Sequence, residues 1–155
     1  MIALLTAAWA GSAGLYGGPL AYRGPVRHDL RPAFGVWGRA PVGPLQLTGE
    51  LLGAWRSRAS LEHRVILGRA SVLAGVGTGG ERAHVGIGLG PALVVRTGSA
   101  GPYAFTAFSP AVRAATHFDL HLGRLPLAAR YQLGTTVRAA RAWDFDVAIG
   151  LGAWW

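Results

Sequence analysis

Three polar residues late in the chain have a spacing that could bind a metal ion. His117, Asp119 and His121 form an H-x-D-x-H run, and side chains two residues apart in a β-strand point to the same side. Imidazole nitrogens and carboxylate oxygens are common ligands of zinc. The two histidines are, however, about 13 Å apart along an extended strand, too far for one ion to bind all three residues without a bend. We therefore expect a polar lining here, and the sequence predicts no metal site and no cofactor.

The elements that position these residues are predicted to be β-strands throughout. Apolar and polar residues alternate in strand-length segments separated by glycine, proline and serine, and no segment has sustained helical periodicity. Residues 1–22 carry no charge, and we interpret most of them as the first strand. The pattern predicts eight strands, over residues 2–16, 31–41, 45–58, 63–77, 82–97, 102–122, 126–136 and 141–155.

The sixth of these strands has an irregular pattern. Tyr103 and Phe105 put apolar side chains at odd positions, whereas Phe118 and Leu120 put them at even positions. A bulge near Pro110 would restore the alternation and tolerate the missing amide donor. If the chain turns there instead, the count becomes nine.

The composition favours a sheet with an apolar exterior. Of the 155 residues 51% are hydrophobic, only 14% are charged, and cysteine is absent. A soluble antiparallel sheet needs a polar face for water, whereas a sheet in lipid can expose apolar side chains if it closes into a barrel and pairs every backbone amide. The net charge of +8 could indicate a nucleic-acid binder, but the low charged fraction argues for lipid phosphates as the anionic partner. We expect one domain over residues 1–155.

The last fourteen residues show the clearest alternation, with apolar side chains at every odd position from Trp143 onward. In this pattern the chain resembles bacterial outer-membrane β-barrels, whose final strand has apolar residues at alternate positions and ends in an aromatic residue. The matching residues are Val147, Ile149, Leu151, Ala153 and Trp155. The resemblance, to OmpA- and OmpX-type domains, implies an all-β, eight-stranded antiparallel up-and-down transmembrane β-barrel in the bacterial outer membrane, whose final strand is the signal for the outer-membrane assembly machinery. A signal peptide would have been removed or be absent, although residues 1–10 could be a remnant of one.

The predicted barrel encloses charged residues. An eight-stranded barrel has room inside only for side chains, and an unpaired buried ion costs several kcal/mol. We therefore expect an interior filled by ion pairs, with Glu50 diagonally across from Arg69, and glycines at 86, 88, 90, 150 and 152 that leave room for arginine. The expected network contains Glu50, Arg69, Arg130, Asp119, Asp144 and Asp146, beside the inward-facing Arg39, His84, His117 and His121.

The fifteen cationic residues are all arginine. The predicted turns at the end with the termini are short, and a longer loop over residues 17–30 is expected at the other end, as in transmembrane barrels. Trp55, Tyr103 and Trp143 would mark the outer membrane interface and Trp155 the inner one. Arginine binds phosphate with two parallel hydrogen bonds. The arginines at the outer end are therefore candidates for binding lipopolysaccharide or an external partner. An equally good interpretation is that they are solvated loop charges or pair with Asp144 and Asp146. These residues are Arg23, Arg27, Arg31, Arg56, Arg58, Arg64, Arg96, Arg138 and Arg141.

The predicted function is that of a non-enzymatic, monomeric outer-membrane barrel with a filled interior. Three alternatives remain: a channel for small solutes or ions, a lipid A-modifying enzyme, and a soluble lipocalin-like carrier with its apolar face turned inward. Barrels that deacylate lipid A use a histidine with a serine two positions later, and none of the five histidines has one. Ser71 and Ser109 have no evident activating base.

Overall fold

The computed structural model describes residues 11–23, 28–58, 63–80, 82–100, 102–122, 125–139 and 142–155. These residues form eight strands and no helix long and apolar enough to cross a membrane. The strands are β1 (Ser12–Arg23), β2 (His28–Val42), β3 (Leu45–Arg58), β4 (His63–Gly79), β5 (Ala83–Ala100), β6 (Tyr103–His121), β7 (Leu127–Arg138) and β8 (Ala142–Trp154).

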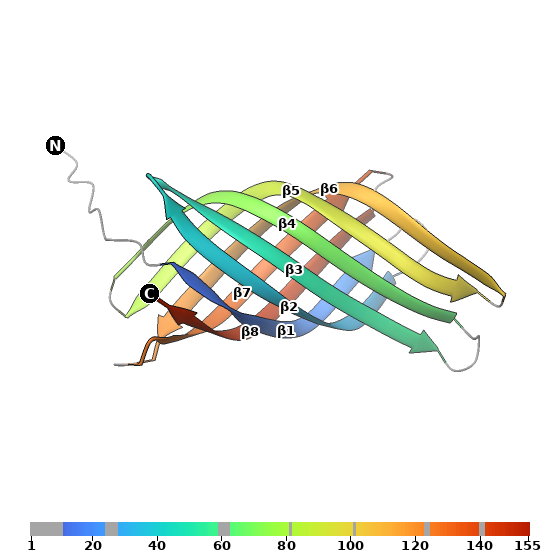
Figure 1. Cartoon of the computed structure of the whole chain (residues 1–155), viewed down its shortest axis with the longest axis horizontal. Coiled ribbons are helices and arrows are strands. Elements are labelled where there is room, and N and C mark those ends of the chain that lie inside the picture. The colour runs from blue at the N-terminus through green and yellow to red at the C-terminus, as the bar shows by residue number, and fades with distance from the viewer. Residues whose placement is uncertain are drawn as a thin grey trace.

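The eight described strands form a closed antiparallel barrel in which each strand pairs with its neighbours in the sequence and β1 pairs with β8 (Figure 1). Ser12 lies opposite Trp154 in this last pair, so β1 begins at the end of the barrel where β8 finishes. We call this the terminal end and the opposite end the outer end. The predicted fold class, an eight-stranded up-and-down barrel, is confirmed.

The first strand differs most from its prediction. Because β1 runs from Ser12 to Arg23, the predicted strand is confirmed over residues 12–16, and the loop predicted over residues 17–30 is wrong where β1 and β2 occupy it. Residues 1–10 lie outside the described part of the chain. The glycines that suggested a loop allow close packing in the wall. A Cβ at Gly18 would lie 2.0 Å from the Val147 carbonyl oxygen, and one at Gly17 would lie 2.8 Å from the Phe34 ring.

The sixth strand has no bulge. The pairing of β6 with β5 is continuous, from Ala83 opposite Leu120 to Ala100 opposite Tyr103, so the predicted bulge near Pro110 is wrong. The apparent change of parity has another cause. The β5–β6 hairpin reaches beyond the rest of the barrel at the outer end (Figure 1), and Phe105, although it has the parity of interior residues, is 43% exposed there.

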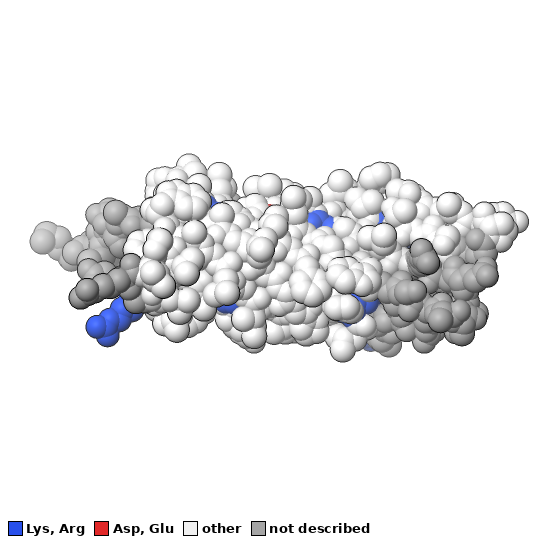
Figure 2. Space-filling view, turned by 60° about the horizontal axis from the view of Figure 1, so that its bottom comes forward, with Lys and Arg blue, Asp and Glu red and all other residues white. Residues whose placement is uncertain are grey.

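The wall of the barrel is apolar on the outside and mixed on the inside. Leu51, Ile87 and Leu151 are between 55% and 62% exposed, whereas Glu50 and Asp146 on the opposite parity are buried. On the face shown in Figure 2, charged side chains are few along most of the barrel. An apolar exterior of this kind fits hydrocarbon and not water. The arrangement rules out a carrier with its apolar face turned inward.

The four aromatic residues expected at the membrane interfaces lie toward the predicted ends of the barrel. Trp55 and Trp143 are exposed near the outer end of β3 and β8, Tyr103 is exposed in the projecting hairpin, and Trp155 follows β8 at the terminal end.

Part of the interior is also apolar, which the sequence did not predict. Buried Tyr16, Leu20, Trp37, Leu52, Leu67 and Val94 belong to one interior cluster.

Candidate functional site

The interior of the barrel contains a group of four charged residues that we call the central ion layer: Glu50, Arg69, Arg113 and Asp146. Arg113 donates from Nε to Glu50 Oε2 at 2.5 Å, and from Nη1 and Nη2 to the two Asp146 oxygens at 2.7 and 3.0 Å. Arg69 donates from Nη1 to Asp146 Oδ1 at 2.8 Å. No member is more than 4% exposed, so two arginines and two carboxylates neutralise each other away from water.

Neutral side chains surround the central ion layer and fix its geometry. Ser71 and Gln132 donate to the two oxygens of Glu50, at 3.2 and 2.7 Å. Thr136 accepts from both Arg69 and Arg113. The absence of a side chain at Gly134 makes room for the Arg113 guanidinium, since a Cβ there would lie 2.4 Å from Nη2. Glu50, Arg69 and Arg113 therefore each have a neutral partner as well as an ion pair, whereas Asp146 accepts from the two arginines.

The central ion layer differs from its prediction in two ways. Arg113 was not predicted as an interior residue, although the odd parity that it shares with His117 and Asp119 was a signal for it. The expected diagonal placement of Glu50 and Arg69 is confirmed, because Glu50 lies opposite Ser71 and Arg69 lies opposite Leu52, but Arg69 donates across the barrel to Asp146 of β8. That contact depends on closure of the barrel, which hairpin register alone does not show.

A second charged group lies toward the terminal end, and we call it the His–Asp cluster: Arg39, His84, His117, Asp119 and Arg130. Arg130 donates from Nε and Nη2 to the two oxygens of Asp119, at 2.7 and 2.9 Å. The Arg130 guanidinium carbon lies 3.3 Å from the centre of the Trp37 ring, a cation–π contact. Arg39 donates from Nη1 to Asp119 Oδ2 at 3.0 Å.

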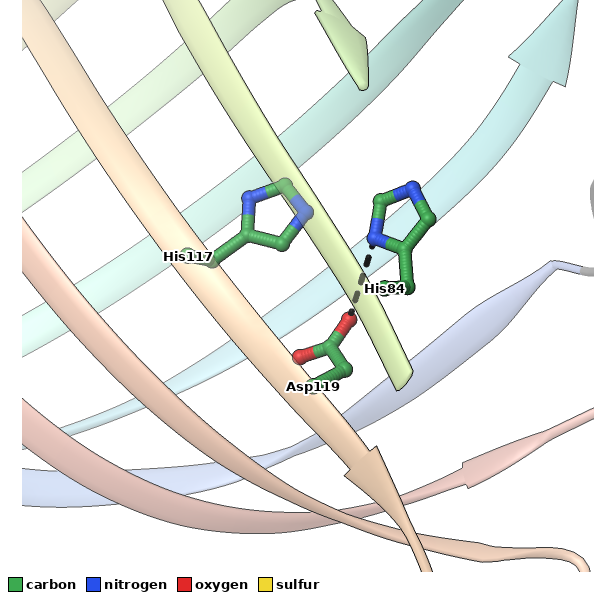
Figure 3. A group of neighbouring side chains, drawn as sticks. All are labelled: His84, His117 and Asp119. Carbon is green, nitrogen blue, oxygen red and sulfur yellow. Dashed lines mark ion pairs between the residues drawn. The ribbon is translucent and has the colours of Figure 1, made fainter. Parts of the chain in front are cut away.

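His84, His117 and Asp119 point toward one another from β5 and β6 (Figure 3). Their ligand-type atoms all lie within 4.8 Å of one another, and the two imidazole rings are stacked at 5.3 Å. His121, the third residue of the H-x-D-x-H run, is not in this group, and its ring stacks on Trp154. The strand geometry thus separates His121 from His117 as expected. His84 replaces it because it lies directly opposite Asp119.

The interior glycines make room mainly for groups other than arginine. A Cβ at Gly86 would lie 2.7 Å from His117 Nε2, and one at Gly152 would lie 2.6 Å from the Trp37 ring. At Gly88 the nearest atom would be Leu73 Cβ, and at Gly90 and Gly150 it would be a backbone oxygen of the neighbouring strand. The expectation that these five glycines accommodate arginine is therefore wrong, and Gly134 has that role for Arg113.

Asp144 pairs with Arg138 in the interior near the outer end. Arg138 donates from Nη2 to Asp144 Oδ1 at 2.8 Å, and the two residues are 5% and 0% exposed. Arg138 therefore belongs with the interior ion pairs and not with the exposed arginines of the outer end.

Three other candidate arginines lie near the outer end, beside aromatic rings. Arg23 is exposed and its guanidinium lies 5.8 Å from the centre of the Trp143 ring. Arg31 and Arg96 are half-buried and approach Tyr22: Arg31 lies 5.9 Å from its ring centre, and Arg96 Nη1 donates to its hydroxyl at 3.3 Å.

The remaining candidate arginines cannot be assigned contacts. Arg56 and Arg58 lie in the last residues of β3, and Arg64 lies in the second residue of β4, so their backbones are at the outer end as predicted. The side chains of these three arginines are not among those that the structure describes. Arg27 and Arg141 lie outside the described residues altogether.

The proposed assembly signal lies along the outer face of β8. Ile149, Leu151 and Ala153 are exposed, Val147 is half-buried, and Trp155 follows the strand with 70% of its surface exposed.

No protein-family model and no curated protein matches the chain, but several solved structures do. Neisserial surface protein A is 7% identical with a TM-score of 0.75, and the match covers 94% of this chain and 97% of that one. Ail, the attachment invasion locus protein of Yersinia pestis, is 12% identical with a TM-score of 0.69, covering 95% and 100%. Ail is also matched in its complex with the heparin analogue sucrose octasulfate, at 11% identity and a TM-score of 0.70, covering 95% and 100%. The N-terminal barrel domain of Pseudomonas aeruginosa OprF is 11% identical with a TM-score of 0.64, covering 93% and 97%.

These likenesses define the class of fold and not the activity, because the identities are low. The chain has the fold of an eight-stranded outer-membrane β-barrel, and the resemblance seen in its final strand is confirmed. The fold and the apolar exterior agree with the predicted location in the bacterial outer membrane.

Proposed function

We propose that this protein is a non-enzymatic, monomeric outer-membrane barrel whose interior is closed by ion pairs and whose outer end binds anionic groups of lipopolysaccharide or an external partner. The central ion layer is the observation that supports the closed interior. Glu50, Arg113 and Asp146 bridge β3, β6 and β8 across the barrel with hydrogen bonds of 2.5 to 3.0 Å. A permeating ion would have to break these contacts, which are expensive to break without water.

A channel is the rival to this proposal, and conductance in planar bilayers separates the two. Purified protein should give no stable single-channel steps. Replacing Arg113 by alanine and Glu50 by glutamine together removes one long side chain and both of these charges while leaving Asp146 with Arg69, and small steps should then appear. Regular conductance steps from the unmodified barrel would contradict the closed interior.

The outer end gathers arginines around one aromatic ring, which supports anion binding. Arg31, Arg96 and Arg138 gather around Tyr22, at the distances given above and with Arg138 4.8 Å from the ring centre. Asp144 is the carboxylate paired with Arg138. Phosphate and sulfate groups are well matched to arginine, and the structurally similar Ail is known in complex with a sulfated heparin analogue.

Binding to lipopolysaccharide vesicles tests this part of the proposal. The double variant Arg31→Gln and Arg96→Gln should bind several-fold more weakly than the unmodified protein. Arg82→Gln is the matched control, because Arg82 is an exposed arginine at the terminal end and should not affect binding. Equal binding by the double variant and the control would contradict a role for these arginines.

The outward-facing pattern of β8 supports its proposed role as the signal for the assembly machinery. Replacing Trp155 and Leu151 by serine should reduce insertion into the outer membrane in cells, while Trp154→Ser, on the other parity, should have a smaller effect. Similar insertion of all three proteins would contradict this role.

A further inference from the structure

We propose that His84, His117 and Asp119 form a binding site for one divalent transition-metal ion of the zinc class, and that the Arg39 guanidinium fills this site in the metal-free protein. The inference is independent of the proposed function, because it concerns the terminal end of the interior and requires neither lipopolysaccharide binding nor a closed pore.

The position of Arg39 Nη1 carries the proposal. This atom lies 2.8 Å from His84 Nδ1, 3.0 Å from His117 Nε2 and 3.0 Å from Asp119 Oδ2. Arginine can only donate, so both imidazoles must direct a lone pair at Nη1. Two nitrogen lone pairs and one carboxylate oxygen therefore converge on a single point that is occupied by a positively charged group.

Arg39 satisfies these three acceptors incompletely. A guanidinium Nη carries two hydrogens, whereas three acceptors surround Nη1. A metal ion at the same point could bind all three atoms if each moved inward by about 0.8 to 1.0 Å, since zinc binds nitrogen and oxygen ligands at about 2.0 to 2.2 Å. The residues supply three ligands, which leaves a fourth tetrahedral position for water.

Neighbouring groups orient the three ligands, as the hydrogen-bond partners of metal ligands do in metal sites. The Gln46 side-chain amide lies 2.9 Å from His84 Nε2. Because His84 Nδ1 accepts from Arg39, Nε2 carries the proton, and the amide accepts it by turning its oxygen toward the ring. Arg130 holds the Asp119 carboxylate from the other side. The lack of a Cβ at Gly86 makes room for the His117 ring.

The ligand set and its location define the class of ion. Two imidazoles favour zinc, nickel or copper, whereas magnesium and calcium prefer oxygen ligands. His84 is the second residue of β5, and Asp119 is two residues from the end of β6, so the site is close to the aqueous terminal end. An ion entering there must displace Arg39, which is itself near the end of β2.

Isothermal titration of the folded, EDTA-treated full chain in detergent with zinc chloride tests the proposal. The unmodified protein should bind one zinc ion per barrel and should give no saturable heat with magnesium chloride. Arg39→Gln should bind zinc at least tenfold more tightly, because the competing cation is gone. His84→Ala and His117→Ala should each bind at least tenfold more weakly, and His121→Ala is the matched control that should bind as the unmodified protein does.

A migration shift on boiling in a semi-native gel shows that each variant is folded, because a closed barrel resists detergent until heated. Absence of saturable zinc binding by the unmodified protein would overturn the proposal, even if Arg39→Gln bound zinc, since Arg39 would then be a permanent occupant. Unchanged binding by folded His117→Ala, or loss of binding in His121→Ala, would overturn it as well.

Discussion

The central ion layer and the His–Asp cluster both enclose charged side chains in the barrel, but they compensate these charges differently. In the central ion layer two arginines face two carboxylates, and the side chains in its ion pairs are at most 2% exposed. In the His–Asp cluster two arginines share one carboxylate with two histidines, and the exposure of Arg39 and His84 rises to 6% and 9%. The first arrangement is balanced, whereas the second has an excess of positive charge and of ligand atoms.

This difference indicates that the two regions have different roles. A balanced, fully buried network allows no exchange of partners and, as we propose, closes the interior. A cluster in which one nitrogen serves three acceptors, close to the aqueous end, can exchange one cation for another. The predictions below test whether stability depends mainly on the first region and ligand binding on the second.

The largest effect is expected from Arg113→Met. This change leaves Glu50 without an arginine partner and leaves Asp146 only Arg69, and breaking a buried ion pair on one side costs about 3 to 5 kcal/mol. The free energy of unfolding, measured by urea titration of the protein in lipid vesicles, should fall by this amount. Arg23→Met, at an exposed arginine, is the control; a loss for Arg113→Met no larger than for that control would contradict the role of the layer.

A smaller loss of stability is expected from Arg39→Gln without metal. Asp119 keeps its two hydrogen bonds to Arg130, so no carboxylate is left unpaired. The variant loses the charged hydrogen bond to Asp119, which contributes about 1.5 to 3 kcal/mol, and the glutamine amide can replace part of the contact with the two histidines. The same urea titration compares it directly with Arg113→Met. If Arg39→Gln were the more destabilising of the two, the distinction between the regions would be wrong.

Gly134→Ala should also weaken the central ion layer. The added methyl group would collide with the Arg113 guanidinium, which the ion pairs hold in place, and overpacking of this kind costs about 1 to 3 kcal/mol. Gly49→Ala is a matched control, because nothing lies within 4 Å of its added methyl group. Equal stability of the two variants would show that Arg113 can move aside.

The smallest effect on stability is expected from His117→Ala. It removes one of the three acceptors that share the two hydrogens of Arg39 Nη1, so the loss should be less than that of a full charged hydrogen bond, about 1.5 to 3 kcal/mol, and every carboxylate stays paired. Urea titration should therefore show little change even though zinc binding is lost. A loss as large as that of Arg113→Met would mean that the His–Asp cluster is primarily structural.

The alternation of residues predicted most of the fold, because lipid on one side and a narrow interior on the other impose a strict period of two. The bounds of β3 agreed fully, and only the first strand was misassigned, since Gly17 and Gly18 look like loop residues until the neighbouring strands are in place. Interior pairing was predicted less well. Arg69 with Asp146, and His84 with His117, join residues far apart in the sequence, and their contacts follow from closure and register.

The central claim is that apolar side chains of the strands face hydrocarbon while the other parity is enclosed. Methyl-labelled protein in lipid nanodiscs tests it by nuclear Overhauser effects between side-chain methyl groups and lipid acyl chains. Ile87 and Leu151, which are 55% and 62% exposed, should show strong effects, whereas Leu52 and Leu67, at 5% and 1%, should show none. Strong effects at Leu52 and Leu67 and none at Ile87 and Leu151 would contradict the account.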